Sequence, residues 1–133
     1  MQRQRVPVAS PLGATIGYSR AVRAGDLVFV AGTTATSPDG GALHPGDAGK
    51  QTEVILERIG AALRELGAGL EDVVETRIYV TDMALWPAVG QAHGAVFKDI
   101  RPASTLVQVG PLIFPGLLVE ISAIASIVGR GGA

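Results

Sequence analysis

The stretch Arg101-Pro102-Ala103-Ser104-Thr105-Leu106-Val107-Gln108-Val109 is followed, after an apolar loop, by Leu118-Val119-Glu120-Ile121-Ser122-Ala123-Ile124-Ala125. Runs of β-branched and apolar residues bounded by proline and glycine are typical of strands, which we predict over Ser104–Val109 and Leu117–Val128. Side chains alternate between the two faces of a strand, so Glu120 should share a face with Leu118, Ser122 and Ile124. We expect the two strands to lie side by side.

The preceding segments predict three further strands and two helices. The strands are expected at Tyr18–Val22, Leu27–Ala31 and Val73–Thr81, with a hairpin turn at Ala24-Gly25-Asp26 joining the first two. A helix is predicted over Lys50–Leu66, where Ile55, Ile59, Ala62, Leu63 and Leu66 recur at helical spacing. A second is predicted over Pro87–Phe97, because proline suits a first helical turn. The turn-rich segment Ser37–Gly49 is expected to be a surface loop.

This order of elements predicts a mixed sheet with two helices on one face. The opposite face of the sheet then has no helix packed on it. We expect Leu106, Leu118 and Ile124 on it, and a closed homo-oligomer that buries it. Hydrophobic residues make up 47% of the chain and charged residues only 17%, which also favours a partner subunit.

Length and composition set the class of protein. The 133 residues predict one domain over 1–128 and a flexible glycine-rich tail over 129–133. A net charge of -1 without a basic stripe argues against a nucleic-acid surface. No apolar run reaches the roughly 18 residues of a membrane helix, and the N-terminal segment lacks the apolar region of a secretory signal, so a cytoplasmic location is expected. The absence of cysteine excludes disulfides and thiol catalysis.

The sequence resembles the reactive-intermediate deaminase family, RidA/YjgF, over nearly its whole length. The resemblance lies in Gly17-Tyr18-Ser19, in Leu27 to Gly32, in Val73 to Asp82 and in the two closing strands. It implies a chorismate-mutase-like α+β fold with a mixed six-stranded sheet, two helices on one face, and a homotrimer with ligand clefts between subunits. Family members hydrolyse enamines and imines of 2-oxo acids to the keto acid and ammonia, with no metal and no cofactor.

The family's glutamate falls on Glu120, and its carboxylate-binding arginine, which follows Pro-Ala, is replaced by Ser104. Imine hydrolysis needs a carboxyl group to position water or move protons and, for a 2-imino acid, a cation to hold the substrate carboxylate. A serine hydroxyl offers one neutral hydrogen bond where a guanidinium offers two charged ones. The chain is therefore expected to belong to a divergent branch that lacks this anchor, unless Arg20, Arg23, Arg77 or Arg101 replaces it.

Further residues are assigned to the cleft by family position, and each has a structural alternative. The expected substrate-binding residues are Tyr18, Gly32, Ser104, Thr105, Leu106 and His93, with Glu120 as the catalytic residue. Gly32 is alternatively a strand-ending turn, Tyr18 an interface aromatic, and His93 a partly buried histidine that shares a helix face with Trp86 and Phe97. His44 and Asp47 make a poor ligand set, so no metal site is expected.

Three functions stay open on the sequence alone. The first is a hydrolase of reactive enamines, imines or related C=N metabolites in which Glu120 positions water. The second is a homotrimer that binds a small metabolite without turnover, which Ser104 favours. The third is an endoribonuclease, which the family's historical label suggests and the charge balance disfavours.

Overall fold

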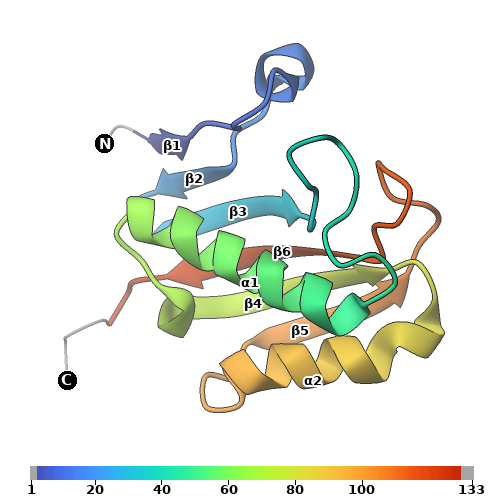
Figure 1. The fold of residues 1–133 in the computed structure, drawn as a ribbon. Coiled ribbons are helices and arrows are strands. Elements are labelled where there is room, and N and C mark those ends of the chain that lie inside the picture. The colour runs from blue at the N-terminus through green and yellow to red at the C-terminus, as the bar shows by residue number, and fades with distance from the viewer. Residues whose placement is uncertain (1–2, 130–133) are drawn as a thin grey trace.

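The computed structural model describes residues 3–129. Six strands form one mixed sheet in the order β1-β2-β3-β6-β4-β5. Both main helices cover the same face of it (Figure 1). The strands are β1 (Gln4–Val6), β2 (Ala21–Ala24), β3 (Leu27–Thr33), β4 (Val73–Val80), β5 (Ala103–Gln108) and β6 (Val119–Ser126), and the helices are α1 (Ala48–Glu65) and α2 (Trp86–Phe97). The predicted α+β fold is confirmed.

Helix α1 supplies most of the core because its apolar residues recur on one side. Ile55, Ile59 and Leu63 are fully buried, and the predicted stripe is confirmed along its whole length. Asp47 caps the helix by accepting a hydrogen bond from the Lys50 amide, 3.0 Å away. At the other end Arg23 donates from Nη1 to the Leu66 carbonyl, at 2.9 Å.

The predicted β2–β3 hairpin is confirmed, with Ala24 paired to Leu27 and Gly25 at a φ of 64° in the turn. Strand β1 was not predicted, because three residues at a sheet edge carry no readable alternation. Two short elements, a π-helical turn at Gly13–Gly17 and a 3-10 turn at Met83–Leu85, also carry no periodic signal. The part of the predicted tail beyond Gly129 lies outside the described residues.

Two expectations about the closing strands are wrong. Strand β4 separates β5 from β6, because β5 pairs parallel to β4 through the α2 crossover while β6 inserts antiparallel between β3 and β4. Leu106 pairs with the buried Ile78 and packs against the helix-covered core, so it is not on the open face of the sheet. Ile124 is on the open face, paired with Phe29.

Candidate functional site

Glu120 lies on the open face of β6, between two residues that face the helices. Val119 and Ile121 are fully buried, whereas Glu120 is half-buried and pairs with Tyr79 of β4. Its side chain lines both a cavity of about 380 Å³, shared with Tyr79 and Ser122, and a larger cleft of about 920 Å³. The Glu120 carboxylate therefore borders both the cavity and the larger cleft.

Gly32 makes room for that carboxylate. The pairing of β3 with β6 shifts between Val30 and Thr33, so the strand bulges at this point. A Cβ at Gly32 would overlap Oε2 of Glu120 and lie 3.0 Å from its Cδ. Glycine thus allows the close approach of the glutamate, and it lies within β3 and not in a strand-ending turn.

Arg20 reaches the same cleft from the residue before β2. Its Nη2 donates hydrogen bonds to the carbonyls of Ala31 and Gly32, at 2.8 and 2.7 Å. Its Nε is buried and has no hydrogen-bond partner within residues 3–129. Burial lowers the pKa of Arg20, while the nearby Tyr18 and Glu120 raise it and Arg58 lowers it further. An arginine remains charged after such shifts, so the cleft holds a desolvated cation.

The cleft joins segments that are far apart in the sequence. Tyr18, Arg20, Gly32 and Glu120 line it together with Arg58 of α1. Arg58 donates from Nη1 to the Thr34 carbonyl and from Nη2 to the Thr36 carbonyl, at 2.8 and 2.9 Å, which fixes the chain as it leaves β3. The remaining walls are largely apolar and include Ile16, Ile113 and Phe114.

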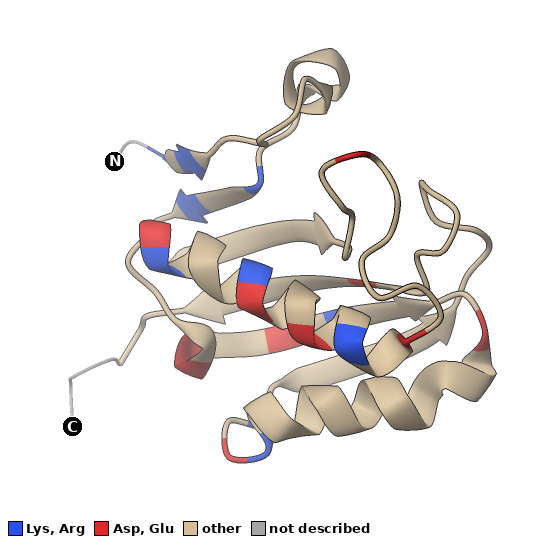
Figure 2. Cartoon of the chain, in the orientation of Figure 1, with Lys and Arg blue, Asp and Glu red and all other residues tan. Residues whose placement is uncertain are grey.

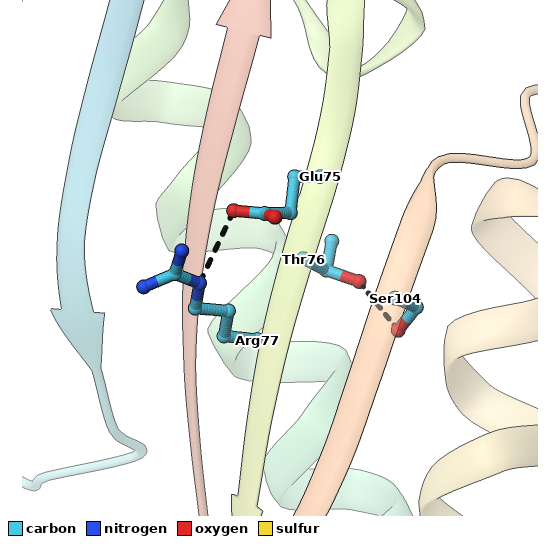
Figure 3. A network of polar contacts seen from close by, with 4 residues as sticks. All are labelled: Glu75, Thr76, Arg77 and Ser104. Carbon is cyan, nitrogen blue, oxygen red and sulfur yellow. Dashed lines mark hydrogen bonds and ion pairs between the residues drawn. The ribbon is translucent and has the colours of Figure 1, made fainter.

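Four of the predicted cleft residues lie elsewhere in this chain. Ser104 and Leu106 point to the helix-covered side of β5, as does His93 of α2, and Thr105 lines none of the cavities described above. Thr76 Oγ1 lies 2.8 Å from Ser104 Oγ, to which it donates, and 3.0 Å from His93 Nε2. The Thr76–Ser104 bond bridges β4 and β5 (Figure 3). A binding role for these residues would require a neighbouring copy.

Within one chain Ser104 and Glu120 therefore face opposite sides of the sheet. Each has partners on its own side of the sheet: Thr76, which bonds Ser104, is fully buried beneath the helices, and Glu120 faces the opposite way. Alternation along two strands fixes this result, because residues aligned with the buried Thr76 and Ile78 point inward. The crevice predicted to hold both side chains was expected between neighbouring copies, so it stays a prediction.

Of the four arginines considered as replacements, only Arg20 lines the cleft. Arg23 caps α1, and Arg77 pairs with Glu75 at 3.1 Å on the surface of β4 (Figure 3). Arg101 donates from Nε to the Lys98 carbonyl, at 2.9 Å, in the turn after α2.

Sequence reasoning missed Arg58 and Gln51. Arg58 occupies an ordinary position on the polar side of an amphipathic helix, and nothing in the sequence shows which carbonyls it will meet. Gln51 is fully buried, and its amide contacts the backbone at Gly116 and Leu118, beyond the apolar loop that borders the cleft. The one sign of Gln51 in the sequence was a polar residue within the apolar pattern of a helix.

The helices of residues 3–129 were compared with membrane spans and for their charge. Neither helix of residues 3–129 combines the length and hydropathy needed to cross a bilayer. Acidic and basic residues are interspersed along α1, and α2 contains no Lys, Arg, Asp or Glu (Figure 2). Within the same described range, no three histidine or acidic side chains are grouped so that they could hold a metal ion.

The mixed sheet covered on one face by two helices is a fold that known proteins share. The Endoribonuclease L-PSP family profile matches residues 8–127. A crystal structure of a YjgF/YER057c/UK114 family member from Mycobacterium tuberculosis superposes with a TM-score of 0.83 at 50% identity, covering 94% of this chain and 99% of that one.

Curated relatives agree with this assignment. An uncharacterized protein of Streptomyces coelicolor is 40% identical over 119 residues, covering 89% of this chain and 87% of that protein. The 3-aminoacrylate deaminase RutC of Acinetobacter baylyi is 36% identical over 110 residues, covering 83% and 86%. The chain belongs to the RidA/YjgF family, also described as Endoribonuclease L-PSP.

Proposed function

We propose that this protein is a hydrolase of small reactive enamines and imines, a deaminase in which Glu120 handles the attacking water. The observation that carries the proposal is the placement of the Glu120 carboxylate, half-buried on the wall between two cavities and seated against Gly32. The RutC relative, a 3-aminoacrylate deaminase, supports the same class of reaction.

The reaction requires one group that can take and return a proton. Water adds to the carbon of the C=N bond while Glu120 accepts a proton from it, and the nitrogen is protonated. The resulting carbinolamine then loses ammonia as the C–N bond breaks and the C=O bond forms. An enamine enters the same route after protonation at carbon. The chain represents a branch in which Ser104 replaces the family arginine, so its substrate differs from, or binds more weakly than, ordinary 2-imino acids.

We further propose that the protein is a homotrimer with its ligand clefts between subunits. Its proposed location is the cytoplasm. Apolar residues on the open face support it, since Leu27 and Phe29 of β3 are 40% and 41% exposed in the single chain. Such a face is typical of a surface that a second copy covers. A trimer that only binds a metabolite is the alternative, which the serine at position 104 favours.

The test follows imine loss directly. 2-Iminopropanoate, 2-iminobutanoate and 3-aminoacrylate are generated enzymatically, and their decay is recorded with wild type, Glu120→Gln and Glu75→Gln. Because acid–base groups contribute about 10²–10⁴-fold, Glu120→Gln should lower kcat/KM at least a hundredfold. Glu75→Gln is the matched control, since Glu75 lies on the same sheet face but lines none of the described cavities.

Two outcomes would contradict the proposal. Binding of these compounds without turnover would favour the metabolite-binding trimer. RNA cleavage that persists through repurification and disappears in Glu120→Gln would favour the endoribonuclease instead.

A further inference from the structure

The cleft beside Glu120 has a charge balance that favours an anion. Of the described residues that line it, Arg20 and Arg58 are positive, Glu120 is negative and the others are uncharged. The balance is one net positive charge in a partly desolvated space, where it attracts an anionic group more strongly than at an open surface.

The two guanidinium groups are held in different ways. Arg58 uses both terminal nitrogens on the Thr34 and Thr36 carbonyls. Arg20 uses Nη2 alone, for the Ala31 and Gly32 carbonyls. The Nε of Arg20 is buried without a hydrogen-bond partner among residues 3–129, and its Nη1 is not used in the two carbonyl bonds.

A buried donor without a partner is rare and costs free energy, so it calls for an explanation. The two carbonyl bonds fix the plane of the Arg20 guanidinium against the bulge of β3, at the glycine that Glu120 approaches. A cation oriented in this way is preorganised for a planar anionic ligand such as a carboxylate.

We propose that Arg20 is the carboxylate-binding residue of this protein and replaces, from the same chain, the arginine lost at Ser104. The inference rests on the proposed function and narrows its substrates to enamines and imines that bear a carboxylate. Ile113 and Phe114, which line the same cleft, would contact a small apolar substituent.

The test measures binding and not turnover. 2-Oxobutanoate, a stable keto-acid product, and its neutral counterpart 2-oxobutanamide are titrated into the protein by calorimetry. Wild type should bind the acid at least about tenfold more tightly than the amide. Arg20→Gln should weaken binding of the acid roughly ten- to hundredfold and leave that of the amide nearly unchanged, because one charge-assisted hydrogen bond is lost.

Controls separate binding from folding. Arg20→Lys keeps the positive charge but not the planar guanidinium, so its affinity for the acid should lie between those of wild type and Arg20→Gln. If Arg20→Gln does not fold, Arg20→Lys takes its place in the test. Arg101→Gln removes an arginine outside the cleft and should bind as wild type does. Arg20 variants that bind the acid like wild type, or a wild type that does not prefer the acid, would overturn the proposal. A wild type that binds the acid through Arg20 but hydrolyses no imine would refute the proposed function alone.

Discussion

The Glu120 carboxylate occupies the space that a side chain at Gly32 would need. A Cβ there would lie 3.0 Å from Glu120 Cδ and closer still to Oε2. Arg20 holds the other side of the same glycine by donating to its carbonyl at 2.7 Å. Gly32, which has no side chain, thus sets the spacing between the Glu120 carboxylate and the Arg20 guanidinium.

Gly32→Ala should therefore damage catalysis more than folding. The atom displaced is the end of a movable side chain, so the fold can absorb the methyl group, and overpacking should cost about 1–3 kcal/mol. The carboxylate must shift by an ångström or more, which typically lowers rates about a hundredfold. Imine turnover and urea denaturation of the same preparation would measure both effects.

Gly94→Ala is the matched control. A Cβ at Gly94 meets nothing within 4 Å, and the residue lies inside α2. Alanine is preferred over glycine in a helix, so stability should rise by about 0.5–1 kcal/mol with turnover unaltered. Equal loss of turnover in both variants would show that the Gly32 contact has no special role.

The sequence predicted those elements whose pattern is local. The β2–β3 hairpin, the buried stripe of α1 and the alternation of β6 each follow from neighbouring residues, and the structure confirms them. Placement of Glu120 on the face opposite Val119 and Ile121 was one such consequence.

Pairing between distant strands was not predictable in this way. Nothing local in β6 says that it inserts between β3 and β4, which leaves β4 between the strands of Ser104 and Glu120. The partners of Arg20 and Arg58 are main-chain carbonyls, which every residue has. Their positions depend on the bulge in β3 and the packing of α1, and so emerge only in three dimensions.

Ser104→Arg should not raise imine turnover. The side chain at this position points to the helix-covered side, where Ser104 Oγ accepts a hydrogen bond from Thr76. The Glu120 cleft lies on the other face, and Arg20 already supplies a cation there. We expect kcat/KM within about twofold of wild type, since no new contact with the substrate forms. A gain of tenfold or more would instead place residue 104 in the cleft of a neighbouring copy.

His93 should make stability depend on pH. Burial lowers its pKa below the ordinary value of 6.5, so the unfolded chain binds more protons in mildly acidic solution. The stabilisation is complete above about pH 6.5 and is lost as the pH falls through the folded-state pKa. Melting temperatures from pH 8 to pH 5 should fall less steeply in His93→Gln than in wild type. His44→Asn, in the exposed loop before α1, should keep the wild-type slope.

Phe29→Glu should break up the proposed trimer. Phe29 stands between Val22 and Ile124 on the open face, and it is 41% exposed in the single chain. A charge there could not be buried against another copy without a partner, which is strongly unfavourable. Sedimentation should give three copies for wild type and one for the variant. Met83→Glu, at a residue 39% exposed outside the sheet, should leave the assembly intact.

Gln51→Leu should destabilise the fold through the loop that borders the cleft. The buried Gln51 amide donates to the Gly116 carbonyl at 2.9 Å and accepts from the Leu118 amide at 2.9 Å. Leucine fits the volume but removes the partner of both part-buried backbone groups, which should cost about 1–3 kcal/mol in urea denaturation. Gln91→Leu, at an exposed position of α2, should change stability by less than about 0.5 kcal/mol. Because Phe114 lies in the released loop, substrate affinity should fall in Gln51→Leu even where the protein remains folded.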